Sequence, residues 1–235
     1  MKKFYFYFLI FVLSANQLVN SQNYRLGIGG GINSCSLFGI NAPVSYDKQY
    51  SYSGGFYLDS RIAQHLSTLT ELKFARYKFN FTEPIPLVDS SLLSIQEKTN
   101  FLTVPVLLRY KRGYEFAFYY VNVGMQFSML LNNNRTSSLI INNLNVDPDY
   151  YYNFQHNLFS YGLVAGIGFQ IKAVNMDLRY YYSTRNMYKR KDSREMRYNI
   201  LSLEMYYQFN YKDATPFGRK TGWKGFKYKI KHLFK

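Results

Sequence analysis

The sequence predicts an all-β protein, an eight-stranded antiparallel up-and-down transmembrane β-barrel with a basic C-terminal tail. Apolar and polar residues alternate with a period of two in eight segments, and long and short connections alternate between these segments. A period of two gives each strand one apolar face and one polar face. This suits a barrel with lipid outside and a polar interior. Beyond the N-terminal segment, apolar runs stay well below the ~20 residues that a membrane helix needs.

The clearest pair of strands spans Phe101–Ser128. Two alternating segments flank a short turn at Arg112-Gly113, as in an antiparallel hairpin. The apolar side chains that we expect to face outward are Leu102, Val104, Val106, Leu108, Tyr110, Tyr119, Val121, Val123, Met125 and Phe127.

Six further segments alternate in the same way, at 24–33, 55–62, 70–79, 157–172, 177–182 and 199–211. Long connections are expected near 35–51, 83–98 and 131–155, and one of moderate length at 185–197. An even strand count with short turns at one end is typical of bacterial outer-membrane barrels and places both chain ends in the periplasm. A tyrosine-rich soluble β-sandwich or β-barrel is the alternative.

The N-terminal segment, 1–21, has the features of a secretory signal. Lys2 and Lys3 precede a short apolar core, Phe4–Leu13, and a cleavage site is expected before Gln22. The predicted organisation is therefore a signal peptide at 1–21, an outer-membrane barrel at 22–211 and a basic periplasmic tail at 212–235. Cys35 is the single cysteine, so it is expected to be a free thiol in a loop.

Charged residues on the predicted strands fall on the inward face. Five positive and four negative side chains are close to balance, as expected if they pair in a confined interior. A shift of one residue in register would push this set into lipid, so the register is strongly specified. The predicted structural charge network consists of Arg25, Asp59, Arg61, Glu71, Lys73, Arg109, Asp177, Arg179 and Glu204.

Glycines also share this inward face on the first predicted strand, at Gly27, Gly29 and Gly31. Glycine weakens a strand unless another group approaches closely, so we expect long side chains from other strands to fill the space. A phosphate-binding loop fits poorly, because neither a Lys-Ser/Thr pair nor a helical pattern follows.

The sequence offers no catalytic constellation, and we predict a protein that is not an enzyme and has no cofactor. The three histidines, His65, His156 and His232, are too scattered to predict a metal site. His156 and Ser160 would share one strand face, but four residues place them ~13 Å apart, too far for a nucleophile and its base. A lipid-modifying barrel enzyme and a barrel that binds a small solute remain alternatives. An open channel is not expected, because side chains can fill an eight-stranded barrel.

Positive charge is concentrated in two segments outside the predicted strands. The connection 185–197 carries six Lys/Arg and two acidic residues, and the tail 212–235 carries eight Lys/Arg and one Asp. Nucleic acid is not an expected partner of an exported membrane protein. Instead, we expect the connection, through Lys189, Arg190 and Lys191, to contact lipid phosphates outside.

The tail has an amphipathic pattern that suits an anionic lipid surface or the groove of a partner protein. It would form a short basic helix, although a strand, a disordered segment or a solvated charged tail also fits the pattern. The residues predicted to make these contacts are Trp223, Lys224, Phe226, Lys227, Ile230, Lys231 and Phe234.

Three segments, FLTVPVLLRYK (101–111), YGLVAGIGFQI (161–171) and DLRYYYSTRN (177–186), resemble the PorT-like outer-membrane β-barrel family of Gram-negative bacteria. Pro105 and the glycines Gly162, Gly166 and Gly168 carry the resemblance, which covers Gln22–Tyr211. It implies the barrel fold and a location in the outer membrane. Some relatives are linked to protein secretion across this membrane, and no functional residue can be transferred. We therefore expect a structural or scaffolding protein, or an accessory to a secretion or assembly complex, with outer-membrane lipid and other outer-membrane or periplasmic proteins as partners.

Overall fold

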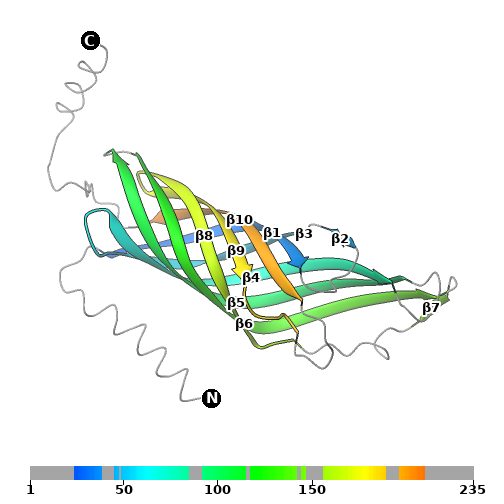
Figure 1. Cartoon of the computed structure of the whole chain (residues 1–235). Helices are drawn as coiled ribbons and strands as arrows, with labels where there is room; N and C mark the ends of the chain where they lie inside the picture. The colour runs from blue at the N-terminus through cyan, green and yellow to red at the C-terminus, as the bar shows by residue number, and fades with distance from the viewer. Residues whose placement is uncertain are drawn as a thin grey trace, which may run out of the picture.

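The computed structural model describes residues 24–38, 45–47, 49–84, 92–114, 117–141, 144–146, 156–188 and 196–209. These residues form ten strands (Figure 1). The strands are β1 (Tyr24–Phe38), β2 (Ser45–Asp47), β3 (Gln49–Arg61), β4 (Leu66–Pro84), β5 (Leu92–Tyr114), β6 (Ala117–Ile141), β7 (Leu144–Val146), β8 (Phe159–Ile171), β9 (Val174–Ser183) and β10 (Arg197–Gln208). In this part of the chain no helix has the length and hydropathy needed to cross a bilayer.

Eight of these strands close into an antiparallel barrel, which confirms the predicted fold class. Its order is β4-β3-β1-β10-β9-β8-β6-β5, and pairing between β4 and β5 closes the ring. The short strands β2 and β7 only extend the sheet beside β4 and β6. Short connections at 62–65, 115–116 and 172–173 share one end of the barrel, which we call the turn end, and the longer connections share the opposite loop end.

Strands β4, β5 and β6 continue past their neighbours at the loop end (Figure 1). The predicted loops at 83–98 and 131–155 are therefore wrong in part, because much of both segments is strand. Residues 96–100 of β5 and 132–136 of β6 are polar on both faces, so the alternation of apolar and polar residues gave no signal there. These parts of β5 and β6 are strand because they pair with each other: Glu97 lies opposite Arg135, and Lys98 lies opposite Asn134. The register of β5 and β6 shifts next to Phe101, which marks a β-bulge.

The outward face of the barrel is an apolar belt. Large apolar side chains are exposed on every barrel strand, while most of their chain neighbours are buried or half-buried. On β6, for example, Val121 and Val123 are 53% and 57% exposed, while Asn122 between them is 0% exposed. On β6 the belt reaches Leu131, and the next exposed residues, Asn132, Asn134 and Thr136, are polar.

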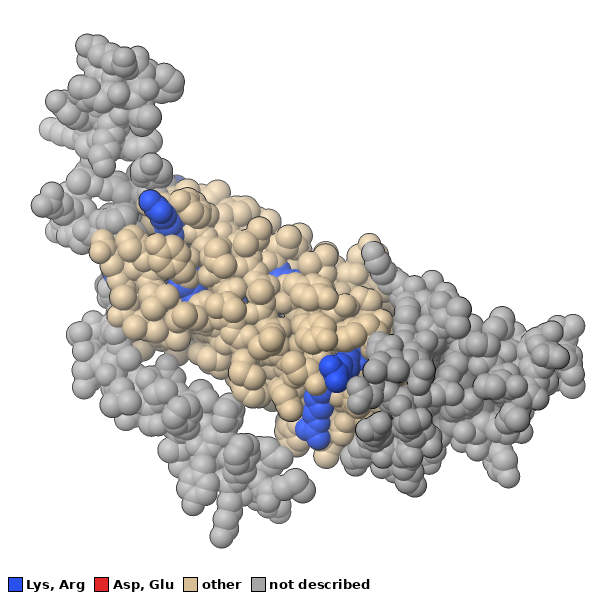
Figure 2. Space-filling model, viewed as in Figure 1, with Lys and Arg blue, Asp and Glu red and all other residues tan. Residues whose placement is uncertain are grey.

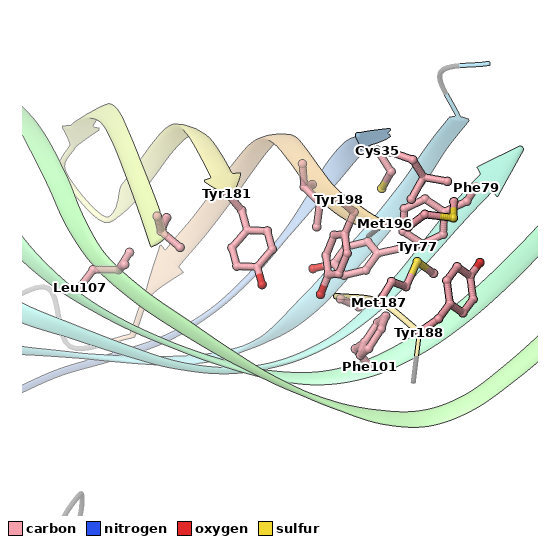
Figure 3. Packing of buried hydrophobic residues seen from close by; sticks show 14 of the residues in the cluster. Cys35, Tyr77, Phe79, Phe101, Leu107, Tyr181, Met187, Tyr188, Met196 and Tyr198 are labelled. Atoms are coloured by element: carbon pink, nitrogen blue, oxygen red, sulfur yellow. The ribbon is translucent and has the colours of Figure 1, made fainter. Parts of the chain in front are cut away.

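The interior is filled in two layers, and this division was not predicted. Towards the turn end the buried side chains include the charged residues, together with tyrosines, amides and the leucines Leu69 and Leu107. Towards the loop end they are aromatic, aliphatic and sulfur-containing (Figure 3). The Tyr198 ring of β10 lies 6.3 Å from Tyr77 of β4 and 5.5 Å from Tyr181 of β9, so side chains meet across the barrel. The expectation of a polar interior was therefore only partly right, since the loop-end layer is largely apolar.

Inward glycines give these interior side chains room, as the sequence suggested. A Cβ atom on Gly31 would lie 2.7 Å from Glu204 Cγ, and one on Gly166 would lie 2.8 Å from Arg179 Cγ. On Gly168 it would lie 2.5 Å from the Tyr120 ring. Real Cβ contacts are longer, so these charged and aromatic side chains occupy the space that a side chain would need.

Cys35 corrects another expectation. It lies within β1 rather than in a loop, and only 1% of it is exposed. Its Sγ atom lies 3.4 Å from Ser51 Oγ of the neighbouring strand β3. The thiol is free but buried among the loop-end layer, so it acts as a small packing residue there.

Candidate functional site

The charged layer near the turn end contains equal numbers of acidic and basic side chains. Each ion pair links residues that the barrel brings together from separate strands or from adjacent inward positions. The acids are Asp59, Glu71, Asp177 and Glu204, and the bases are Lys73, Arg109, Lys111 and Arg179.

One half of the layer is centred on Arg179 of β9. Its guanidinium group lies 2.8 Å from Glu71 Oε1 and 3.1 Å from Glu204 Oε2. Lys73 contacts the same two carboxylates, at 2.9 Å from Glu71 and 2.7 Å from Glu204. Both acids therefore share two cations, and β4 is tied to β9 and β10 across the interior. The hydroxyl of Tyr206 donates a further hydrogen bond to Glu204.

The other half is centred on Asp177. Arg109 of β5 donates from Nη2 to Asp177 Oδ2 at 3.1 Å, and its Nε donates to Asn122 Oδ1 at 2.8 Å. The Arg109 guanidinium group stacks over the Tyr120 ring at 4.0 Å, and the Tyr120 hydroxyl also donates to Asp177. Arg179 pairs with Asp177 as well, so the two halves form one continuous network.

Asp59 and Lys111 extend the network towards the turn end. Lys111 Nζ pairs with Asp59, and Arg109 Nη1 lies 3.9 Å from the same carboxylate. Lys111 was missed from the sequence, because the strand was expected to end at Tyr110. The period of two places it on the same face as Arg109, so extending the alternation by one residue would have found it.

Two residues of the predicted network lie apart from these pairs. Arg61 donates to the backbone carbonyls of Ala63 and Gln64 in the β3–β4 turn. Arg25 lies opposite Asp59 in the register of β1 and β3. Both arginines line a small pocket at the turn end with Asp59, Lys111 and His65. The structure therefore places them at the mouth of the barrel, beside the charged layer.

The pairing within the charged layer stabilises ionised side chains inside the barrel. A buried charge without a partner costs several kcal/mol, whereas each carboxylate here contacts at least one cation. His156 and Ser160, which their spacing in the sequence places too far apart to act together, have different partners: Ser160 Oγ contacts Tyr198, and His156 contacts Glu97. Among the described residues, no group of three His, Cys, Asp or Glu side chains is placed to hold a metal ion.

A second polar cluster, which the sequence reasoning missed, lies at the loop end beyond the apolar belt. Glu97 of β5 accepts from Tyr188 Oη at 2.6 Å and from Asn133 Nδ2 at 3.0 Å, and His156 Nε2 lies 2.6 Å from it. Burial raises the pKa of Glu97, but these hydrogen bonds and the nearby imidazole outweigh it, so the net pKa lies below the ordinary 4.5. Burial and the Glu97 charge raise the pKa of Tyr188.

This cluster joins β5 and β6 to the segments that flank β8 and follow β9. His156 and Tyr188 form an isolated β-bridge, and their rings lie 4.7 Å apart. Glu97 was missed because 83–98 was expected to be a loop. The inward series Glu97, Thr99 and Phe101 does keep a period of two, and this was the available signal.

The remaining predicted contact residues lie outside the residues that the structure describes. These are the tail residues Trp223, Lys224, Phe226, Lys227, Ile230, Lys231 and Phe234, and the loop residues Lys189, Arg190 and Lys191.

The comparison with protein families agrees with this architecture. A family model described as "Outer membrane protein beta-barrel domain" matches residues 17–189. A comparison with curated protein sequences gives no match. Among solved structures, Ail of Yersinia pestis, in complex with the heparin analogue sucrose octasulfate, is 13% identical with a TM-score of 0.42 and covers 80% of this chain and 99% of its own. OprG of Pseudomonas aeruginosa is 12% identical with a TM-score of 0.41, covering 79% and 94%. Neisserial surface protein A is 13% identical with a TM-score of 0.40, covering 78% and 97%.

Proposed function

Because the chain belongs to the outer membrane protein β-barrel family, we propose that it is a non-enzymatic barrel with a sealed interior that serves as a rigid scaffold in the outer membrane. The observation that carries this proposal is the neutral charged layer, in which four acids and four bases pair across the barrel. Such a layer stabilises one arrangement of the strands, and its charged groups pair with one another inside the barrel.

The scaffold would act alone or as an accessory to a secretion or assembly complex. The resemblance of three segments to the PorT-like family supports the second role, because some members of that family are linked to secretion. In this proposal 1–21 is a signal peptide that is removed on export. The turn end faces the periplasm, together with both ends of the mature chain, since short turns are periplasmic in bacterial outer-membrane barrels.

The basic tail would then lie on the periplasmic side, where its apolar and basic residues could contact anionic lipid or a partner protein. Affinity purification in mild detergent, with the full chain and with a variant lacking 215–235, tests this role. We expect the full chain to retain partners that the shortened chain loses. Identical partners for the two chains would contradict a role of the tail in assembly.

The sealed interior is tested separately by reconstituting the purified protein in planar bilayers. We expect no stable large conductance steps, because side chains from β4, β5, β9 and β10 meet inside the barrel. Lasting steps of constant size would contradict a sealed barrel. Comparing the lipid masses of membranes with and without the protein tests the enzymatic alternative, and we expect no new lipid species.

A further inference from the structure

The mouth of the barrel at the turn end carries an excess of positive charge. A small pocket there is lined by three basic side chains, Arg25, Arg61 and Lys111, and by one acidic side chain, Asp59. Two positive charges of this lining are therefore not balanced by an acid of the pocket. On the face drawn in Figure 2, the described barrel shows blue Lys and Arg near its ends, and no red is visible. The pocket is suited to a negatively charged ligand.

Arg25 of β1 has no hydrogen bond or ion pair with any other described residue. Asp59 lies opposite it in the register of β1 and β3. The Asp59 carboxylate, however, pairs with Lys111 Nζ and lies 3.9 Å from Arg109 Nη1. The acid opposite Arg25 is therefore shared by two other cations, and the Arg25 guanidinium group retains donors for a ligand.

Acidic residues of the adjoining connections do not remove the positive excess. The connections 62–65 and 172–173 contain no acid, and the connection 115–116 contains one, Glu115, which lies outside the described residues. Its single charge balances at most one of the two positive charges. The tail at 212–235, which follows β10 at the same end, adds eight Lys/Arg and one Asp. The turn end is therefore positive on the count of all these residues.

Ser67 of β4 offers a second donor to the same pocket. It is 4% exposed, and strand pairing places it between Arg61 and Arg109. Ser67 Oγ lies close to the Asp59 carboxylate, but it makes no hydrogen bond of ordinary geometry with a described group. A buried hydroxyl without a partner destabilises the fold, so a ligand oxygen that accepts from Ser67 would remove this penalty.

The size of the pocket selects the kind of anion. The cavity measures about 30 Å³, and an atom of the size of a water molecule needs roughly 10–15 Å³ of such space. The cavity therefore admits about two oxygen atoms, the number in a carboxylate group, and is too small for the oxygens of a phosphate group. A guanidinium fork also matches a carboxylate with two parallel N–H donors.

The pocket lies beside the start of the basic tail. Phe209 N donates to the carbonyl of Leu26, the residue after Arg25, at 2.9 Å. The tail at 212–235 follows with its eight Lys/Arg. An acidic stretch of a protein would be attracted by the tail while one of its carboxylates enters the pocket. A small free acid has a single charge and gains less from the tail, so this position favours a carboxylate carried by a protein.

We propose that this pocket binds a carboxylate of an acidic segment in a partner protein, with Arg25 and Ser67 as its donors. The site deepens the proposed function, because it rests on the periplasmic orientation of the turn end and gives the accessory role a partner of defined chemistry. Binding to the purified protein does not depend on this orientation, so the pocket and the scaffold role are tested separately.

The test uses the full chain in detergent micelles at neutral pH and measures binding by isothermal titration calorimetry. The probes are a peptide with a run of aspartates, the same peptide with asparagines, acetate and inorganic phosphate. Arg25→Gln and Ser67→Ala each remove one proposed donor. Arg112→Gln is the matched control for charge, because Arg112 is an exposed cation at the same end that does not line the pocket. Far-ultraviolet circular dichroism verifies that the variants are folded.

We expect the native chain to bind the aspartate peptide more tightly than the asparagine peptide or either small anion. Arg25→Gln should weaken binding of the aspartate peptide by at least about tenfold, and Ser67→Ala by at least about threefold. Arg112→Gln should stay within about twofold, because salt screens an exposed charge outside the pocket.

Equal losses in Arg25→Gln and Arg112→Gln would overturn the proposal in favour of net charge alone. Acetate or phosphate binding as tightly as the aspartate peptide would overturn the assignment to a protein carboxylate. Glu115→Gln should bind the aspartate peptide within about twofold of the native chain, because the pocket does not need that acid. Binding that occurs only in this variant would overturn the proposal, since the native chain would then fill the pocket itself.

Discussion

Lys73 Nζ lies 2.7 Å from Glu204 Oε1, although 131 positions separate the two residues in the chain. Lys73 belongs to β4 and Glu204 to β10, and two other strands lie between them in the sheet. The pair therefore spans the interior rather than following the wall. Contacts of this kind make the barrel rigid, because they oppose movement of one side of the barrel relative to the other.

The substitution Lys73→Met tests the energetic role of this contact. It leaves Glu71 and Glu204 buried with Arg179 as their remaining cation in the charged layer. We expect the free energy of unfolding to fall by about 3–5 kcal/mol, the usual cost of breaking a buried pair. Urea titration in micelles measures it, with Lys98→Met at an exposed site of β5 as the control. A loss no larger than that of the control would show that the pair contributes little.

Glycine substitutions test how tightly the interior is packed. In Gly168→Ala, the new Cβ would lie 2.5 Å from Tyr120 Cε2, so we expect a loss of about 1–3 kcal/mol. Gly54→Ala is the matched control, because its nearest neighbour would be Gly29 O at an ordinary 3.5 Å. The same unfolding measurement compares the two variants. Similar stability of both would mean that the space beside Tyr120 is larger than the structure indicates.

The Glu97 cluster predicts a dependence of stability on pH. The folded pKa of Glu97 lies below its ordinary value of 4.5. Its contribution to stability is therefore present above pH 4.5 and is lost as the pH falls through the folded value. We expect the stability difference between the native chain and Glu97→Gln to shrink as the pH falls from above 4.5 to below it. A difference that stays constant over this range would contradict the assigned direction of the shift.

A charged substitution on the outward face tests which part of the barrel lies in the hydrocarbon region of the bilayer. Val123 of β6 is 57% exposed within the apolar belt, and Val123→Arg should cost about 2–4 kcal/mol in a bilayer. Thr136→Arg on the same strand is the control, because Thr136 is exposed beyond the end of the belt. Unfolding from phospholipid vesicles measures both variants. Equal costs would place Val123 outside the hydrocarbon region.

The alternation of apolar and polar residues was sufficient to predict the barrel, its strand count and the inward position of most of the charged layer. It failed where both faces of a strand are polar, and for this reason Glu97 and the loop-end parts of β5 and β6 were assigned to loops. It also failed at Cys35, because a mixed segment of small and polar residues gave no reason to extend β1 to Phe38. The specific partners, such as Lys73 with Glu204, depend on which strands face each other across the barrel, and the pattern of a single strand does not contain this information.

Neighbouring residues of one strand face lipid and the charged interior in turn. Val121 is 53% exposed and Tyr120 is 2% exposed, with Arg109 stacked on its ring. The most direct measurement is tryptophan fluorescence of Val121→Trp and Tyr120→Trp in vesicles whose acyl chains carry bromine, with Trp223 replaced by Phe. We predict strong quenching at position 121 and little at position 120. Equal quenching at both positions, or stronger quenching at 120, would contradict the claim.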